Sequence, residues 1–598
     1  MHVKEGKEMK KLICLLLASL LCLAGCSTTP KAPAAEGESL FKAGTYTGVG
    51  DGRNGPITVE MTFTAGAIES ITVKEHTETA GICDPAIEKI PGAVVESQSL
   101  GVDTVAGATL TSDGILKAIE DCVVQAGGDV EKLKAATEKT PQAKTEESRS
   151  TDVVVVGSGI TGMSAALSAK EAGADVVVIE KQATTGGTTA IAGGYLISID
   201  SKLYDDSDFD DSLETFRKYW DERMSYSGQE SGYPDEERWE AIVSKTGETV
   251  DWLQEKGVTW EAFTGFGPYP TAHNPAGGRG LIDEMVKIAE AQGIEVITEC
   301  KGEKLVLDDQ GAVVGIVAET SDKVITFNTA SVVLATGGIS ANAEMVKQYS
   351  PKVDKAGTIS VAAAGSTGDG LTMALEAGAV PFDSFFTSIC ATTVDPALAS
   401  QVADASKLTT NKQLGVNAKG ERFASEAAVY FDALGSDMIQ DGNAPFYYIY
   451  DSSDAEIAKI LEQGATAGAV VKADTIEALA EGMKVDAATL KATYDRYQEQ
   501  VAAGKDEDFG KAAENLTSLE TAPYYAVVFY PTTFGSQGGV LTSETGQVLN
   551  QAKEAIPGLY AAGEMSNRYF YNENYVLAAS LGLYATTGRI AGAAAAAK

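Results

Sequence analysis

Three closely spaced glycines between an apolar run and a helix have the spacing needed to hold a phosphate group. The run Thr151–Val156 predicts a buried parallel strand, and Gly157–Gly162 has glycine at its first, third and sixth positions. A helix to about residue 172 and a second strand over 175–179 then lead to Glu180. In such a unit the glycines allow a tight turn, close approach of a pyrophosphate and packing of the helix on the strand. The acid at the end of the second strand binds ribose hydroxyls, so the unit predicts a dinucleotide site.

Further glycine-rich segments decide which dinucleotide this unit would bind, because NAD fits the same unit. They lie at 186–194, 332–338, 365–370 and 558–564. In this order they resemble the flavoprotein-subunit family of fumarate reductase, flavocytochrome c and succinate dehydrogenase, from Thr151 to the end of the chain. The resemblance implies noncovalent FAD, a capping domain inserted into the FAD domain, and a final helix over about 580–596 whose N-terminus points at the flavin ring.

The glycine unit and the resemblance together give the residues expected to hold FAD. The family's G-D-G and A-G-E motifs assign Asp369 and Glu564. The full expected set is Gly157, Ser158, Gly159, Thr161, Gly162, Glu180, Lys181, Gly187, Thr188, Thr189, Gly193, Gly194, Thr336, Gly337, Asp369, Glu564, Ser580 and Leu581.

A second cofactor signature lies upstream, in Asp103-Thr-Val-Ala-Gly-Ala-Thr-Leu-Thr-Ser112. It resembles the flavinylation signal of small FMN-carrier domains, such as that of the sodium-pumping quinone reductase. The resemblance implies that FMN is joined through a phosphoester to Thr109, with Thr111 as the fallback site. Alternating residues predict strands over 45–50, 57–63 and 68–73, followed by a helix over 86–98. We expect Ser112 to cap a helix that starts near Asp113, which would leave Thr109 in the turn before a helix N-terminus, a site that favours an anion.

These patterns predict an α/β protein with a Rossmann-like FAD-binding domain, an inserted α+β capping domain and a preceding small α+β FMN-binding domain. The expected organisation is a signal peptide (1–25), a tether (26–40), the FMN-binding domain (41–128) and a linker (129–150), followed by the first part of the FAD-binding domain (151–383), the capping domain (384–530) and the second part of the FAD-binding domain (531–598).

The expected substrate site departs from the resembled family. Fumarate reductases of this family grip two carboxylates with His and Arg and protonate carbon with an Arg shortly after a G-x-R-F-x-x-E motif. That motif stands at 420–426, and the position of the acid falls on Tyr430. The C-terminal carboxylate-binding Arg is replaced by Tyr575, and the substrate His positions fall near Phe534 and Cys390. Tyr neither carries charge nor binds carboxylate in a bidentate fashion, which argues against fumarate.

The two tyrosines resemble those of 3-ketosteroid Δ1-dehydrogenases. The resemblance implies that Tyr575, with the backbone amide of Ala579, polarises a carbonyl, and that Tyr430 exchanges a proton. Tyr430 and Tyr575 are therefore the candidate catalytic residues, and Phe534 and Cys390 are further candidate substrate contacts. The alternative is that both tyrosines only pack.

The N-terminus predicts export. Lys10 and Lys11 precede the apolar run 12–23, which is too short to span a membrane, and Leu23-Ala24-Gly25-Cys26 resembles a bacterial lipobox. The resemblance implies lipid on Cys26 and a protein anchored to the outer face of the cell membrane. An ordinary secretory signal is the alternative.

The composition limits the partners. Acidic residues outnumber basic ones by 84 to 47, giving a net charge of −37, which disfavours nucleic acid as a partner. Three His residues and scattered Cys residues without a C-x-x-C-H motif argue against a metal site or an attached c-type haem, and we expect free thiols.

The sequence thus predicts an exported reductase that passes electrons from a membrane or extracellular donor to covalent FMN, then to FAD, and then to an enone or acrylate-type C=C bond. One alternative is a ketone or ketosteroid dehydrogenase that works in the oxidative direction. Others are an electron-transfer lipoprotein without substrate chemistry and, at the family level, a fumarate or urocanate reductase.

Overall fold

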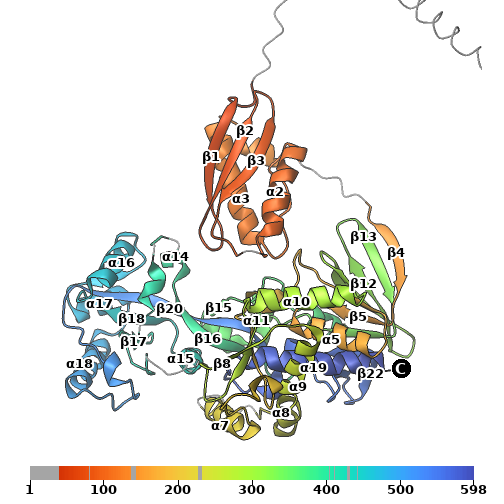
Figure 1. The fold of residues 1–598 in the computed structure, drawn as a ribbon. Coiled ribbons are helices and arrows are strands. Elements are labelled where there is room, and N and C mark those ends of the chain that lie inside the picture. The colour runs from red at the N-terminus through yellow and green to blue at the C-terminus, as the bar shows by residue number, and fades with distance from the viewer. Residues whose placement is uncertain are drawn as a thin grey trace, which may run out of the picture.

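The computed structural model describes residues 39–597 apart from 80, 136–142, 226–231, 400, 403, 410, 427–430 and 441. Cys26, with the predicted signal peptide, and Tyr430 lie outside the described residues. Figure 1 shows a small N-terminal domain placed above α10 of a large domain, with a third domain to one side. Within the described residues no helix has the length and apolar character needed to cross a bilayer.

The small domain is an antiparallel sheet covered by two helices. The strands β1 (Gly44–Asp51), β2 (Pro56–Phe63) and β3 (Ile68–Glu75) pair in sequence order, and α2 (Asp84–Ser97) and α3 (Thr109–Gln125) complete the core. A Cβ at Gly48 would lie 2.1 Å from the Ala118 carbonyl oxygen, so glycine lets α3 lie directly on β1. The short helix α4 (Val130–Ala135) follows.

The expected start of α3 was wrong by one helical turn. The helix begins at Thr109, with Ala108 as its N-cap. The Ser112 hydroxyl donates to the Ala108 carbonyl at 2.9 Å and accepts from the Val105 amide at 3.1 Å. Ser112 therefore stabilises the loop before the helix from inside the first turn, and Thr109 is itself the first helical residue.

The large domain is built on a mostly parallel sheet. Its strand order is β10 (Glu295–Ile297), β6 (Val176–Ile179), β5 (Val153–Val156), β14 (Ser331–Leu334), β22 (Ala555–Ala561) and β21 (Gln547–Leu549). The four residues of β5 and of β14 are all buried, as the unbroken apolar runs predict. The helices α5 (Ile160–Glu171) and α19 (Ala579–Ala596) pack together beside this sheet, and the predicted Rossmann-like α/β domain is confirmed.

The other elements of this domain flank the sheet. A small sheet contains β7 (Tyr195–Ile197), β9 (Thr271–His273) and β8 (Glu261–Phe263). The helices are α6 (Gly187–Ile191), α7 (Leu213–Met224), α8 (Glu236–Val243), α9 (Thr246–Lys256), α10 (Gly277–Ala291), α11 (Ala343–Tyr349), α12 (Pro351–Lys355) and α13 (Asp369–Glu376).

The end of the predicted linker belongs to the large domain. Residues 145–150 form β4 (Thr145–Ser150), which pairs in parallel with β13 (Lys323–Asn328) at the edge of a sheet completed by β11 (Lys301–Leu307) and β12 (Val313–Glu319). Every residue of β4 is exposed or half-buried, so its polar sequence carries no strand pattern. The strand forms because β13 supplies the backbone partners, which a local pattern cannot reveal.

The third domain is attached through two paired strands. β16 (Phe386–Val394) and β20 (Tyr524–Gln537) run antiparallel between it and the large domain, and β18 (Phe446–Tyr450), β17 (Leu414–Val416), β19 (Val471–Ala473) and β15 (Ile359–Ser360) complete their sheet. The helices are α14 (Pro396–Ala399), α15 (Phe431–Met438), α16 (Ala455–Thr466), α17 (Ile476–Met483) and α18 (Ala487–Ala503). This is the expected α+β cap, inserted between the two parts of the FAD-type domain.

A buried ion cluster holds the cap together. The Arg422 guanidinium donates to Glu426 at 2.8 and 2.9 Å and to Asp506 at 2.8 Å, and the Lys511 ammonium lies 3.3 Å from Glu426. Burial alone would raise the pKa of Asp506, but the hydrogen bonds from Arg422 and from two backbone amides outweigh it and hold the pKa at about 2. The G-x-R-F-x-x-E motif is thus part of the cap core.

Breaking this cluster should destabilise the cap. Arg422→Met should lower the free energy of unfolding of the cap by about 3–5 kcal/mol, because it leaves buried carboxylates without their partner. Arg496→Met, which removes exposed ion pairs on α18, should cost about 1 kcal/mol or less. Urea unfolding followed by proteolysis of the cap measures both, and equal losses would contradict the assignment.

The same cluster predicts acid sensitivity. The folded-state pKa of Asp506 is about 2 and its unfolded value is about 4, so its stabilising effect is present above about pH 4 and is lost as the pH falls toward 2. Arg422→Met should make the cap's loss of stability over this range less steep, as measured by unfolding at each pH.

Candidate flavin and substrate site

The turn after β5 has the geometry required for a dinucleotide. Gly157 has φ of +104°, and a Cβ there would lie 2.4 Å from the Ala335 carbonyl oxygen. A Cβ at Gly162 would lie 1.9 Å from the Gly157 carbonyl oxygen. At Gly159 the nearest atoms to a Cβ would be 3.6 Å away, so this glycine borders open space at the N-terminus of α5. The first and third glycines serve packing, and the second leaves room for a pyrophosphate.

Charged residues at the strand ends border the same space. The buried Glu180 carboxylate accepts from the Ser158 amide at 3.0 Å and from the Ser158 hydroxyl at 2.6 Å. Lys181 forms an ion pair with Asp369 and donates to the Thr367 hydroxyl at 2.5 Å. These contacts connect the end of β6 to the glycine turn and to the start of α13, as the predicted FAD site requires.

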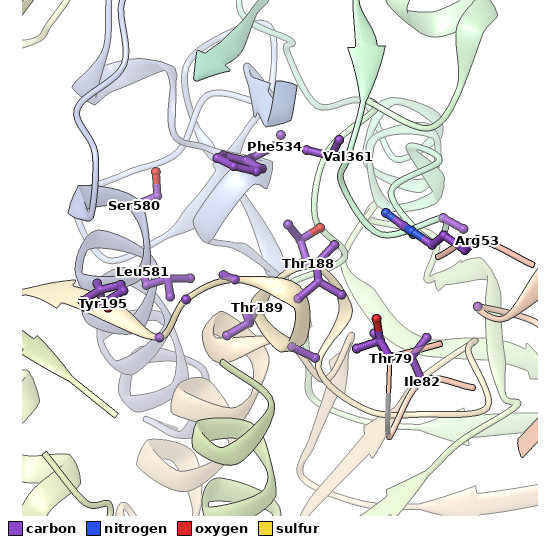
Figure 2. Close-up of a pocket in the computed structure, with 18 of the residues that line it drawn as sticks. Arg53, Thr79, Ile82, Thr188, Thr189, Tyr195, Val361, Phe534, Ser580 and Leu581 are labelled. Atoms are coloured by element: carbon purple, nitrogen blue, oxygen red, sulfur yellow. The ribbon is translucent and has the colours of Figure 1, made fainter. Parts of the chain in front are cut away.

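Two cavities follow from this arrangement. One, of about 100 Å³, runs along the glycine turn, Glu180 and Asp369. The other, of about 650 Å³, lies between the large and small domains, and its lining includes Tyr575 and Phe534; Figure 2 shows Phe534 and other lining residues. All of the predicted FAD-binding residues line one or both cavities except Gly162, which packs α5 against the turn. The residues present therefore fit an extended FAD, with its phosphates at α5 and its ring in the larger cavity.

Glu564 lines both cavities. Its carboxylate accepts from the Ser536 amide at 3.3 Å. Desolvation raises the pKa of Glu564 to about 7, although hydrogen bonds from Ser536 and Gly338 oppose the shift. The Glu564 side chain is therefore partly protonated near neutral pH and can donate a hydrogen bond to a polar group placed beside it.

The small domain supplies the opposite wall of the larger cavity. Figure 2 shows Thr79, Ile82 and Arg53 of this domain on one side, and Thr188 and Thr189 of the large domain facing them.

Thr109 and Thr111 differ in their availability for attachment. Thr109 is exposed on the cavity wall at the first position of α3. Thr111 is buried, and its hydroxyl donates to Glu78. A hydroxyl must be accessible to accept a flavin phosphate, so the geometry favours Thr109 over Thr111.

Aromatic side chains form the far end of the cavity. Tyr575 is only 9% exposed and stacks on Tyr571, with ring centroids 6.0 Å apart. The Tyr571 hydroxyl lies 3.0 Å from the Ser580 hydroxyl at the start of α19. Phe534 is 43% exposed and projects toward the cavity (Figure 2). The structure therefore brings Tyr575 and Phe534 to one site beside the N-terminus of α19, as predicted.

Other expected substrate residues are placed differently. The Ala579 amide donates to the Val576 carbonyl at 3.2 Å, so it does not point into the cavity as the predicted pairing with Tyr575 required. Ala578, in a left-handed conformation, turns the chain into α19 and uses the Ala579 amide to close that turn. Cys390 lies on β16 where the pairing with β20 is irregular. Tyr430 is outside the described residues.

Two arginines near the site escaped the sequence reasoning. Arg53, from the small domain, is the single cationic side chain among the described residues that line the larger cavity. Arg568 is fully buried and donates to the carbonyls of Ser384, Tyr571 and Asn572. Desolvation lowers the pKa of Arg568 to about 10. Because its N–H groups donate to backbone carbonyls, including those of the loop before Tyr575, Arg568 does not replace the missing carboxylate-binding arginines.

Three cysteines are buried free thiols. Cys83, Cys122 and Cys300 form no disulfide, and burial raises the pKa of each to about 11. These thiols are poor nucleophiles at neutral pH. No cluster suited to a metal ion occurs among the residues that the structure describes.

Comparison with known proteins assigns the family. The FAD binding domain model matches residues 152–578, and the FMN-binding domain model matches residues 52–124. The chain belongs to the family of FAD-binding oxidoreductases and carries an additional FMN-binding domain, as the sequence predicted.

Several curated relatives are reductases. Urocanate reductase of Eggerthella lenta is 30% identical over 97% of both chains. NADH:acrylate oxidoreductase of Vibrio harveyi is 30% identical over 92% of this chain, which spans only 61% of that protein. Vinyl phenol reductase of Lactiplantibacillus plantarum is 30% identical over 69% of this chain and 89% of its own length.

Solved structures agree with the fold. The open conformation of a flavocytochrome c3 fumarate reductase matches with a TM-score of 0.56 and 29% identity, covering 78% of this chain and 81% of that one. A 3-ketosteroid-Δ4-(5α)-dehydrogenase from Rhodococcus jostii matches with a TM-score of 0.57 and 26% identity, covering 76% of this chain and all of that one.

The glycine turn gives a test that separates folding from binding. Gly159→Ala should leave the protein folded but lower the affinity for FAD about 10- to 100-fold, because the methyl group would occupy space that the bound pyrophosphate needs, at a cost of about 1–3 kcal/mol. Gly157→Ala should instead destabilise the domain, since its Cβ would overlap the Ala335 carbonyl at positive φ. FAD titration and thermal unfolding distinguish the two variants. Unchanged affinity in Gly159→Ala would place the pyrophosphate elsewhere.

Proposed function

We propose that this protein is an exported flavin reductase in which electrons pass from FMN on Thr109 to FAD and then to an activated C=C bond. The observation that carries the proposal is one cavity of about 650 Å³. It is lined by the loop that leads to Thr109, called here the FMN-attachment loop, and by the FAD site, Tyr575 and Phe534. Such a cavity would bring an electron carrier, a hydride donor and a substrate together. The reductase relatives support the reductive direction.

The cavity wall favours a substrate other than a dicarboxylate. With Arg53 as the one cation among its described lining residues, the wall has no pair of positive groups to grip two carboxylates. The substrates named for three of the relatives fit this limit, since acrylate and urocanate each carry one carboxylate and vinyl phenol carries none, whereas other relatives are named for fumarate. We therefore propose an alkene conjugated to a single carbonyl or to an aromatic group.

The side chains have distinct proposed roles at this site. When bound, FAD supplies hydride to one alkene carbon. The Tyr575 hydroxyl donates to the carbonyl oxygen, and the N-terminus of α19 favours the negative charge that develops there. Phe534 excludes water from one side of the site. Tyr430 remains the proposed proton donor, and its test is the loss of turnover in Tyr430→Phe, by about 10² to 10⁴ for a general acid.

Export and anchoring are also part of the proposal. A lipid on Cys26, with residues 26–40 as a tether, would hold the flavin domains on the outer face of the membrane within reach of a membrane or extracellular electron donor. Mass analysis of the mature N-terminus tests this directly, and an unmodified N-terminus at another residue would contradict it.

Covalent FMN is tested by paired threonine variants. Protein made together with a flavin transferase should keep yellow fluorescence and a mass increase of one FMN minus water after denaturation. Thr109→Ala should lose both signals. Thr111→Ala should keep them, because the buried Thr111 hydroxyl is bonded to Glu78 rather than presented to the transferase. Retention in Thr109→Ala, or loss only in Thr111→Ala, would move the attachment site.

The substrate class is tested with the loaded enzyme. Enones, acrylates and vinyl phenols should reoxidise the reduced protein much faster than fumarate. Tyr575→Phe should lower kcat by about 10²–10³-fold, the typical effect of removing one donor to a developing oxyanion, without changing flavin content. Failure of every alkene would favour an electron-transfer protein, and reduction of FAD by a saturated ketone would favour the oxidative direction. Rapid fumarate reduction, with Tyr575→Phe fully active, would overturn the site assignment.

A further inference from the structure

The small and large domains touch at the segment that follows Glu180. The Ala183 amide donates to the Ala106 carbonyl at 3.3 Å, and the Ala183 methyl packs against the hydrophobic core of the small domain. Ala106 lies in the loop that leads to Thr109. A backbone hydrogen bond and an apolar contact thus join the FMN-attachment loop to the end of β6.

Gln182 lies between the loops of the two flavin sites. A Cβ at Gly107, in the attachment loop, would lie 2.2 Å from the Gln182 Oε1 atom. A Cβ at Gly365, in a loop at the FAD cavity, would lie 2.9 Å from the Gln182 Nε2 atom. Both loops therefore approach the side-chain amide of this one residue closely, and a Cβ at either position would require the Gln182 side chain to shift.

The segment is fixed on the large domain at both of its ends. The Gln182 backbone amide donates to the Glu180 carboxylate at 2.9 Å, and the Gln182 backbone carbonyl accepts from the Glu299 backbone amide at 2.9 Å. Arg279 of α10 donates to the Thr185 carbonyl at 2.7 Å. A rigid segment can hold a docked loop in one position, as electron transfer between two cofactors requires.

We propose that Gln182 and Ala183 are the docking point that positions the FMN-attachment loop, and hence FMN on Thr109, relative to FAD. This inference rests on the proposed two-flavin path and assigns Gln182 as its positioning residue. The Lys89–Glu299 ion pair at the same interface is about half exposed on both sides, so it should add little to docking.

Docking can be measured without FMN. In full-length, FAD-loaded protein made without a flavin transferase, Ala106→Cys with Ala183→Cys should form an intramolecular disulfide, because residues joined by a backbone hydrogen bond have Cα atoms within the range of about 4.4–6.8 Å that a disulfide needs. Adding Gln182→Ala should slow disulfide formation about tenfold. Adding Lys89→Ala, the control at the same interface, should not. Peptide mass mapping follows the reaction.

Electron transfer is then measured in protein that carries both flavins, with flavin content determined first. Stopped-flow absorbance should show transfer from reduced FMN to FAD slowed about tenfold in Gln182→Ala and unchanged in Lys89→Ala. Closing the engineered disulfide between positions 106 and 183 in the Gln182→Ala background should restore the rate, because the covalent bond replaces the lost docking contact. Loss of FAD or misfolding would not be rescued in this way.

The outcomes separate the two hypotheses. No disulfide, or equal rates of its formation with and without Gln182, would overturn the docking point whatever the function. A disulfide that depends on Gln182, together with interflavin transfer that ignores both Gln182 and the disulfide, would uphold the contact but overturn its role in the proposed electron path.

Discussion

The site depends on the close packing of α5 and α19. A Cβ at Gly588 would lie 2.2 Å from the Thr161 carbonyl oxygen, and one at Gly592 would lie 2.1 Å from the Ala165 carbonyl oxygen. The two contacts advance along both helices in the same direction, so the helices run parallel with backbone against backbone. Thr161 is the second residue of α5, whereas Gly588, which lies against it, is the tenth residue of α19. The N-terminus of α19 therefore extends eight residues, or about 12 Å, past the N-terminus of α5. The paired helices thus present two positive N-termini, one at each cavity, where the pyrophosphate and the flavin ring of an extended FAD are expected.

The polar groups around the larger cavity are mostly engaged with the protein itself. Arg568 is held by backbone carbonyls, and the Ala579 amide closes the turn into α19. This leaves Arg53, hydroxyls, the partly protonated Glu564 and the helix N-terminus as the groups able to meet a substrate carbonyl. Such donors suit one negative charge better than two fixed charges, because one cation with neutral donors does not repay the desolvation of a dicarboxylate.

Sequence reasoning succeeded where the determinants are local. The apolar strand, the glycine turn and Glu180 lie within one short stretch, and their roles follow from chain geometry; the motifs quoted from the resembled family then placed Asp369 and Glu564 at the same cavities. It failed where the partner is distant: β4 is defined by β13, and Gln182 gains its place from glycines in two separate loops. The start of α3 was misplaced for a local reason, because Ser112 bonds back to Ala108 and Val105 from inside the first turn. The predicted role of the Ala579 amide was wrong because the spacing between residues does not show which carbonyl accepts a hydrogen bond from a given amide.

The two flavins need different means of retention. The expected FAD site is enclosed over its length by the glycine turn, β6, α13 and α19, so many weak contacts can hold that cofactor without a bond. Thr109 is exposed at the edge of a small domain whose core is already filled by its own sheet and helices, which leaves little surface to enclose a second ring. A flavin there would be held on one side only, and the other side would be completed by the large domain only while the domains touch. A covalent phosphoester on Thr109 would remove that dependence, because the cofactor would then stay with the small domain whether or not the cavity between the domains is closed.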